Sequence, residues 1–454
     1  MKNLLFILSA FTFLSCASQQ TVDNSVKEIV FRNVTVIPMN KNEVLTDQDV
    51  VVMNGKITAI GPTSKVRYGA NAMVIDAKGK YLLPGLAEMH AHVPPVDDIE
   101  PMKDVLKLFA VNGVTTIRGM LGHPRHLELR SKIQSGEIMG PRFITSGPSL
   151  NGNSVKTRED ATTMVKDQKK AGYDFLKLHP GITKENFAAI AATAKEVGIP
   201  FAGHVSFDVG VWRAINAGYA TIDHLDGFVE SLVPGIENMK EQETGLFGLF
   251  LADKADESGI QKLTDSLRNH HIWVVPTQAL AERWFHPAKD PDALGKEPEM
   301  KYMDVNTVNN WINTKKNLLN NPNYKPATVT RLIEIRKKLI NACNKNGVGL
   351  LLGSDAPQVF DVPGFSIHHE LRYLVDAGLT PYEALKTGTV NVGKFLNRED
   401  IGVIKAGAVS DLLLLNGNPL TDISQAHNIE GVMMGNLWMP KGYIAAELKK
   451  LEKK

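Results

Sequence analysis

The chain has 454 residues, of which 43% are hydrophobic and 22% charged, and its formal net charge is +2. This composition is typical of a soluble globular protein. The length allows one large catalytic domain with a smaller companion, or two or three ordinary domains. Because the chain has no long basic run, the sequence argues against a nucleic-acid partner.

The first residues are typical of an export signal. A short basic start precedes the apolar run 4–14, which is too short to span a bilayer as a helix. The run ends in Leu14-Ser15-Cys16-Ala17, which resembles the lipobox of bacterial lipoproteins, where the chain is cut before the cysteine and lipidated. We therefore predict a signal peptide over 1–16, lipidation at Cys16 and a tether over 17–27. An ordinary signal peptide that contains a cysteine is the alternative.

This interpretation predicts an exported lipoprotein that faces the periplasm and touches a membrane only through its lipid anchor. The lack of an aspartate after Cys16 favours the outer membrane. The other cysteine, Cys343, lies in an apolar-periodic segment and is expected in the core, so we predict no internal disulfide in the mature chain.

Both ends of the remaining chain contain short runs typical of β-strands. Asn54-Gly55 separates two of these runs and is a strong signal for a two-residue hairpin. Neither end has enough strands to bury a core alone, so we predict one small β-sandwich built from 28–83 and 396–446. The runs are 29–37, 49–53, 56–60, 402–404, 411–415 and 431–434.

Between these ends, over 84–395, apolar strand-like runs alternate with helical stretches. Alternation of this kind is typical of βα units around a parallel sheet. Eight units favour a closed (β/α)8 TIM barrel, and an open doubly wound sheet is the alternative. The predicted strands are 82–92, 114–119, 142–146, 175–179, 200–205, 221–225, 272–277 and 348–355.

Several of these strands end in side chains that can bind metals. His90 and His92 share one face of the first strand, because side chains alternate along a strand. His204 and His224 end the fifth and sixth strands, and Asp355 follows three leucines at the end of the eighth. A carboxylate there would be costly to bury without a cation or donors nearby.

Lys177 is predicted to point into the barrel from the fourth strand. A buried lysine needs an anionic partner or becomes a neutral amine. A neutral amine can react with carbon dioxide, and the resulting carbamate could bridge two cations. The residues alone leave the carbamate and a lysine–carboxylate ion pair open. Four imidazoles, Asp355 and a carbamate at Lys177 would suit two divalent ions such as zinc.

These motifs resemble the amidohydrolase superfamily, and within it the imidazolonepropionase-like and Xaa-Pro dipeptidase-like group. The resemblance covers nearly the whole chain after the tether. Its further markers are Leu83-Pro84-Gly85-Leu86 before the first histidine pair, Gly353-Ser354-Asp355, the stretch 402–407, Ser410-Asp411-Leu412 and Asn418-Pro419-Leu420.

The resemblance implies a role for each predicted ligand. His90 and His92 would hold one metal ion, His204 and His224 the other, and carboxylated Lys177 would bridge them. Asp355 would bind the first ion and carry the proton, while a hydroxide that bridges the ions attacks the substrate. Imidazolonepropionases use one ion without the lysine, so Lys177 argues against that activity.

The sequence therefore predicts a hydrolase that cleaves an amide-type C–N bond in a small molecule such as a dipeptide, an acyl-amino acid or a cyclic amide. The alternatives are a lactone or phosphoester hydrolase with the same site, and a lipoprotein that binds a ligand without catalysis. His179 departs from the small residues of peptidase-like relatives and either alters substrate choice or is structural. Arg118 either holds a substrate carboxylate, together with nearby His123, or forms an internal ion pair. Substrate-binding residues and homo-oligomer formation remain open.

Overall fold

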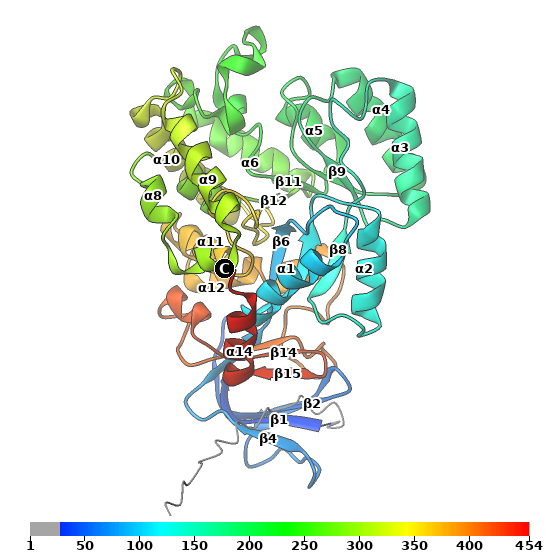
Figure 1. The fold of residues 1–454 in the computed structure, drawn as a ribbon, viewed down its shortest axis with the longest axis vertical. Helices are drawn as coiled ribbons and strands as arrows, with labels where there is room; N and C mark the ends of the chain where they lie inside the picture. Colours follow the sequence, from blue (N-terminus) through cyan, green and yellow to red (C-terminus); the bar gives the residue numbers. More distant parts are fainter. Residues whose placement is uncertain (1–27, 454) are drawn as a thin grey trace, which may run out of the picture.

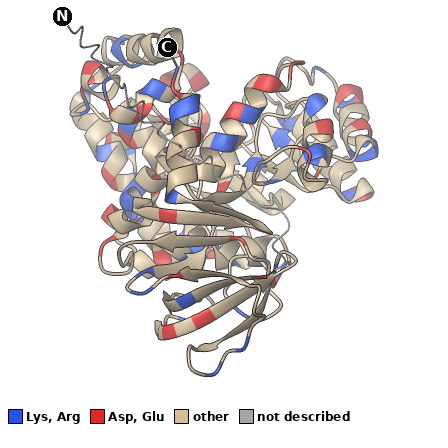
Figure 2. Ribbon diagram, turned by 60° about the horizontal axis from the view of Figure 1, so that its bottom comes forward, with Lys and Arg blue, Asp and Glu red and all other residues tan. Residues whose placement is uncertain are grey.

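The computed structural model describes residues 28–453. The predicted signal peptide, the lipidation of Cys16 and the tether lie outside the described residues. The described chain forms a β-domain and a larger half in which helices surround short strands (Figure 1). Acidic and basic residues intermingle over the helices of this larger half (Figure 2).

Both ends of the chain contribute strands to the β-domain, as the sequence predicts. Asn54 and Gly55 have φ angles of 53° and 74°, the left-handed pair that a tight hairpin between β2 and β3 requires. The sheet order is β15-β14-β13-β5-β1-β2-β3, and β4 also pairs with β1. The strands are β1 (Glu28–Val36), β2 (Leu45–Met53), β3 (Lys56–Pro62), β4 (Met73–Asp76), β5 (Tyr81–Pro84), β13 (Leu412–Leu415), β14 (Ile429–Met434) and β15 (Leu437–Pro440).

The β-domain pairs strands from both chain ends into one sheet. This sheet folds over itself, so that the rings of Phe31 of β1 and Trp438 of β15 meet edge to face, with centroids 5.1 Å apart. The predicted strand 402–404 is wrong. Gly402 has a left-handed φ of 71° and lies against the backbone of Thr389, so this segment turns instead of pairing along its length.

The larger half contains two parallel sheets. The first has the order β6-β7-β8 and the second the order β12-β11-β10-β9. Every residue of these strands is buried except three at half-buried positions in β8 and β12, as expected for a sheet covered by helices. The strands are β6 (Leu86–Ala91), β7 (Val114–Gly119), β8 (Arg142–Thr145), β9 (Leu176–Leu178), β10 (Phe201–Gly203), β11 (Thr221–Asp223) and β12 (Trp273–Val275).

Backbone hydrogen bonds connect these two sheets at both edges. On one side, Leu150 donates to the carbonyl of Lys177 at 2.9 Å. On the other, the predicted eighth strand bonds to both sheets: Leu351 donates to Val274 at 2.9 Å and Met89 donates to Leu352 at 2.8 Å. The eighth segment is too irregular to count as a strand, but these bonds link the eight segments in a ring, which is the barrel arrangement.

The helices alternate with the strands and cover the outside of this ring (Figure 1). Thr380 begins α12 through a capping box with Glu383. Among residues 28–453, no helix is long and apolar enough to cross a membrane. The helices are α1 (Glu100–Val111), α2 (Arg125–Gln134), α3 (Arg158–Ala171), α4 (Lys184–Val197), α5 (Val211–Ala217), α6 (Ile260–Asn269), α7 (Gln278–Leu280), α8 (Pro291–Leu294), α9 (Val305–Leu319), α10 (Pro326–Lys345), α11 (Ser366–Asp376), α12 (Pro381–Thr387), α13 (Val390–Phe395) and α14 (Lys441–Leu451).

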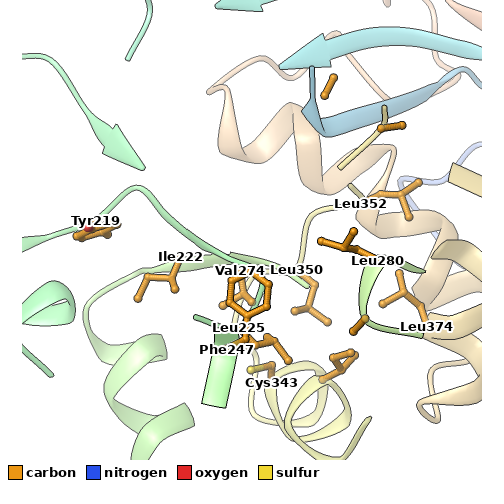
Figure 3. Packing of buried hydrophobic residues seen from close by; sticks show 14 of the residues in the cluster. Tyr219, Ile222, Leu225, Phe247, Val274, Leu280, Cys343, Leu350, Leu352 and Leu374 are labelled. Carbon is orange, nitrogen blue, oxygen red and sulfur yellow. The ribbon is translucent and has the colours of Figure 1, made fainter. Parts of the chain in front are cut away.

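The main hydrophobic core lies between the barrel strands and these helices. Figure 3 shows part of it, where Leu225, Val274 and Leu350 belong to one buried cluster with Phe247. Cys343 of α10 is buried in the same cluster, and burial raises the pKa of its thiol to about 12. The prediction that Cys343 is a core residue is confirmed.

Candidate metal centre

The structure brings together all six of the side chains that the sequence predicts as metal ligands. Each lies in, or directly after, a segment of the barrel wall, so the ends of the parallel segments place them at one end of the ring. His90 lies on β6 with His92 just beyond it, Lys177 lies on β9, His204 follows β10, His224 follows β11, and Asp355 ends the eighth segment.

His90, His92 and Asp355 form a compact group. Oδ1 of Asp355 lies 2.6 Å from Nε2 of His92 and 3.2 Å from Nε2 of His90. One ligand atom from each residue lies within 4.8 Å of the other two, a spacing that a single ion could fill. Burial, together with nearby Lys177, lowers the pKa of His90 well below its usual range. This imidazole is therefore neutral, which is the form that binds metals.

Lys177 lies directly beside this group. Its side chain is fully buried, and Nζ lies 3.4 Å from Nε2 of His90. Burial lowers its pKa to about 8, although Asp223 and Asp355 favour the charged form from further away. Among residues 28–453, no carboxylate lies within ion-pair distance of Nζ, so the predicted alternative of a direct lysine–carboxylate pair is not found there.

A glycine makes room for Lys177. Gly203 of β10 has a φ of 118°, and a Cβ atom there would lie 2.8 Å from Cδ of Lys177. A larger residue at 203 would therefore displace the lysine or strain the strand. The lysine is held in place by backbone that approaches it closely.

His204 and His224 form the second predicted ligand pair, and their ring centroids lie 4.5 Å apart. Nδ1 of His204 lies 3.0 Å from a carboxylate oxygen of Asp226, and Nδ1 of His224 lies 2.9 Å from the hydroxyl of Thr277. Because both Nδ1 atoms already have partners, Nε2 is the atom in each ring that could bind a metal. Burial, and then the charge of Lys177, lower the pKa of His204 to about 3.

A buried ion pair between Asp223 and Arg118 orients His90 through its Nδ1 atom. Oδ2 of Asp223 lies 2.8 Å from Nδ1 of His90, and Nη2 of Arg118 donates to the same oxygen at 3.2 Å. Arg118 also donates from Nε to the carbonyl of Met89. Of the two roles that the sequence leaves open for Arg118, the structure shows the internal ion pair. His123 lies in a different place, near exposed Asp97 at 3.7 Å.

Three residues of the centre have left-handed backbone conformations that side chains other than glycine seldom adopt. The φ angles are 63° at His224, 47° at Thr277 and 73° at Asp355. Such conformations cost about 1–3 kcal/mol each and persist where surrounding structure imposes them, as at ligand sites. The fold therefore imposes an uncommon backbone conformation on two of the predicted ligands, His224 and Asp355, and on Thr277, which bonds to His224.

Residues 81–438 match the amidohydrolase family. This chain belongs to the amidohydrolase family. The match includes all six predicted ligands and spans most of the chain, from β5 to β15. Members of this family generally use divalent metals, and the histidines and the aspartate described above are groups that could bind them.

Individual relatives are distant. A dihydroorotase from Pediococcus pentosaceus is 22% identical over 423 residues, which cover 88% of this chain and 92% of that protein. Adenine deaminase 3 from Rhizobium meliloti is 23% identical over 222 residues, 45% of this chain. The match therefore spans only 37% of that deaminase.

Two solved structures share the fold of this amidohydrolase. A bottromycin amidohydrolase has a TM-score of 0.70 and 22% identity, covering 93% of this chain and 90% of its own. A Xaa-Pro dipeptidase with bound methionine in its active site has a TM-score of 0.63 and 19% identity, covering 91% of this chain and 100% of its own. At these identities the likeness establishes the architecture, a TIM barrel with an additional domain.

Two aromatic side chains surround the second histidine pair of this amidohydrolase. His179 stacks on His204 with ring centroids 4.9 Å apart, and burial beside Lys177 lowers the pKa of His179 to about 2. Phe247 stacks on His224 at 5.0 Å. Both rings therefore lie against the metal centre without belonging to the predicted ligand set.

A second group of ligand-type side chains lies elsewhere in the barrel half. One ligand atom each from Glu297, Glu299 and His369 lies within 4.8 Å of the others. Arg283 already donates to Glu297, and Nε2 of His369 lies 2.8 Å from Glu299. The negative charge of this group, which we call the Arg283 cluster, is therefore already compensated by protein side chains.

The sequence analysis missed the residues that support the ligands. These include Asp223, Asp226 and Thr277, each of which bonds to a histidine. The inward position of Asp223 could have been predicted from the sequence. Asp223 lies two residues after Thr221 on a short apolar strand, so the two side chains share the face that points into the barrel. No sequence pattern predicts the positions of Thr277 and Phe247, because these positions depend on left-handed turns.

Proposed function

We propose that this amidohydrolase cleaves an amide-type C–N bond in a small molecule: a dipeptide, an acyl-amino acid or a cyclic amide. The observation that carries the proposal is the placement of Lys177, buried beside Nε2 of His90 and near Asp355, with a second histidine pair in contact with the first. This arrangement suits two cations that share one anionic bridge.

Two divalent ions, with zinc as the expected metal, fit the donor atoms. His90, His92 and Asp355 would hold one, and His204 and His224 the other. Such ions supply Lewis acidity, which polarises a carbonyl group and lowers the pKa of water to about 7. The orienting bonds from Asp223, Asp226 and Thr277 fix each ring for this task.

Lys177 would bridge the ions as a carbamate. Its neutral amine adds to the carbon of carbon dioxide, a C–N bond forms, and one proton leaves for solvent. The lowered pKa of about 8 makes part of the amine neutral near pH 7. The product is an anion with two oxygens, so carboxylation replaces a buried cation by a bridging ligand.

Asp355 would move the proton. Its carboxylate lies 2.6 Å from His92, at the end of the barrel where a substrate would meet the ligands. It accepts a proton from the attacking water and delivers it to the leaving nitrogen, which breaks the C–N bond. Arg118 takes no direct part, because its guanidinium is bound behind His90 by Asp223.

The choice of an amide over other bonds rests on the family and on the Xaa-Pro dipeptidase and bottromycin amidohydrolase that share the fold. Hydrolysis of a lactone or phosphoester is the second candidate, since the same donors would serve it. We also propose that the protein is an exported lipoprotein, anchored through Cys16 to the outer membrane and facing the periplasm.

A hydrolysis screen tests the proposal. The chain from residue 17 is purified with zinc and bicarbonate and offered Xaa-Pro and other dipeptides, acyl-amino acids, cyclic amides, lactones and phosphoesters. We expect hydrolysis of an amide that disappears in Asp355→Asn. Turnover of lactones or phosphoesters alone would contradict the amide proposal, and a metal-loaded protein inactive on every compound would favour a non-catalytic binding protein.

A further inference from the structure

A cavity of about 710 Å³ adjoins the second histidine pair. It lies between the loop after β10, the helix α5 and the segment 230–259, which joins β11 to α6. Its wall includes Val205, which directly follows His204, and Asp226, which bonds to Nδ1 of His204. Residues that adjoin or contact the predicted ligand His204 therefore form part of the cavity wall.

Phe247 forms the part of the wall nearest to both histidines. Its ring stacks on His224 at 5.0 Å and on His204 at 5.9 Å, and it also lines the cavity. Its φ of 57° is left-handed, and it lies between Gly245 and Gly248, with φ angles of 68° and 74°. The turn therefore holds an aromatic ring in a strained backbone conformation, in contact with both histidines and with the cavity.

The opening of the cavity exposes apolar surface. Trp212 and Leu246 are 37% and 40% exposed, and both line the cavity. Large apolar side chains at the rim of a concave site are typical of a surface that contacts a ligand. The aliphatic part of a substrate would pack here.

Acidic side chains outnumber basic ones in the lining of the cavity. Five acidic side chains line it against two basic ones. Of the basic groups, Lys184 is paired with Asp208 at 3.2 Å, and Arg213 donates to the carbonyl of Val209. The remaining acidic groups are Asp226, Glu230, Glu237 and Glu241.

Among the acidic residues that line the cavity, Glu230 is the one for which the structure shows no structural role. Its Oε2 atom is buried and has no hydrogen-bond partner among the described residues. Burial, and then the nearby charge of Asp226, raise the pKa of Glu230 to about 8. An unpaired buried oxygen costs free energy, and a cation in the cavity would offset that cost.

We propose that this cavity is a specificity subsite for a positively charged group of the substrate, a lysine or arginine side chain or a free amino terminus, and that Glu230 binds it. The proposal rests on the proposed function, since it places a basic substrate beside the hydrolytic centre. The aliphatic part of the group would lie against Trp212 and Leu246, and the charge would reach Glu230. The enzyme would then favour amides that contain a basic residue.

Binding of a matched pair of small probes tests this subsite without any hydrolysis. Butylguanidinium and butylurea have nearly the same shape, but only the first is charged. Calorimetry on the zinc-loaded chain should show butylguanidinium bound about tenfold more tightly or better, the preference that a charge-assisted hydrogen bond provides. Equal affinity for the two probes would overturn the proposal, whatever any variant does.

A matched pair of variants assigns the preference to Glu230. Glu230→Gln should abolish the preference for butylguanidinium, whereas Glu243→Gln, which changes an exposed glutamate of the same segment outside the cavity, should retain it. A preference that persists in Glu230→Gln would overturn the assignment.

Dipeptides with arginine or citrulline at either position then show which end of the substrate enters the cavity. A preference for arginine at one position supports recognition of the side chain, and a preference for free over acetylated amino termini supports recognition of the terminus. If the probes discriminate as expected and no amide is hydrolysed, the proposed function fails and the subsite stands.

Discussion

The metal centre and the Arg283 cluster look alike by composition, yet the structure equips them differently. In each, a carboxylate and an imidazole lie close enough for one ion. In the metal centre, Asp223 orients His90 from behind, and Asp355 meets two imidazoles. In the Arg283 cluster the carboxylates face a guanidinium instead.

The difference teaches that charge compensation, more than the proximity of ligand atoms, separates a metal site from an ion-pair network. A carboxylate that already faces Arg283 has little to gain from a divalent ion, which would also be repelled by the guanidinium. Burial lowers the pKa values of His90 and His204 and keeps these imidazoles neutral, so they lose no ionic partner when a metal binds.

The largest expected effect comes from Asp355→Asn. The amide cannot accept a proton at neutral pH, so the rate should fall by about 10²–10⁴-fold, the range of general acid–base catalysis. The kcat/KM of the substrate found in the screen is the measurement, with metal content determined on the same sample. A rate within about threefold of the unaltered enzyme would show that Asp355 carries no proton.

Asp223→Asn should have the next largest effect. The substitution weakens the bond that orients His90, and loss of such a partner lowers metal affinity by about 10–100-fold. Zinc competition against a chromophoric chelator measures this affinity. Unchanged affinity would mean that the ion pair behind His90 serves the fold alone.

Glu299→Gln is the matched change in the Arg283 cluster, and it should leave metal content and hydrolysis unchanged. Because Arg283 and His369 each lose a charged partner, the free energy of unfolding should fall by about 1–3 kcal/mol. Urea denaturation measures the loss. If the metal content per chain instead falls by one equivalent in this variant, the Arg283 cluster binds a metal ion, and the contrast drawn between the two groups is wrong.

The smallest expected effect is a pH dependence of the stability that Glu299→Gln loses. Burial opposes ionisation of Glu299, but the hydrogen bond from His369 and nearby Arg283 outweigh it and lower its pKa from 4.5 to about 2. A carboxylate with a lowered folded-state pKa stabilises the fold above its unfolded pKa and loses this contribution as the pH falls. The stability difference between the native chain and Glu299→Gln should therefore shrink from about pH 4.5 towards pH 2. A difference that stays constant over that range would contradict the assignment.

Local sequence patterns predicted much of the architecture. The apolar runs placed the barrel segments within a few residues, and Asn54-Gly55 placed a hairpin, because both depend on neighbours in the chain. The folding of one sheet over itself could not be predicted, because it depends on contacts such as that of Phe31 with Trp438, which no local pattern contains.

The six predicted ligands could be found because each lies in or directly after a barrel segment, where a polar residue interrupts an apolar run. Their supports could not all be found in this way. Asp226 and Thr277 lie in loops, and they reach the histidines only because the chain turns sharply after β11 and β12. Phe247 comes from a segment that is remote in sequence from His204 and is brought there by a strained turn.

The central claim is that Lys177, as a carbamate, bridges two metal ions. The most direct test is elemental analysis of metal per chain, after purification with zinc and bicarbonate, for the native chain and for Lys177→Ala. The account predicts two equivalents in the native chain and a sharp fall in the variant. One equivalent in both proteins would contradict the account.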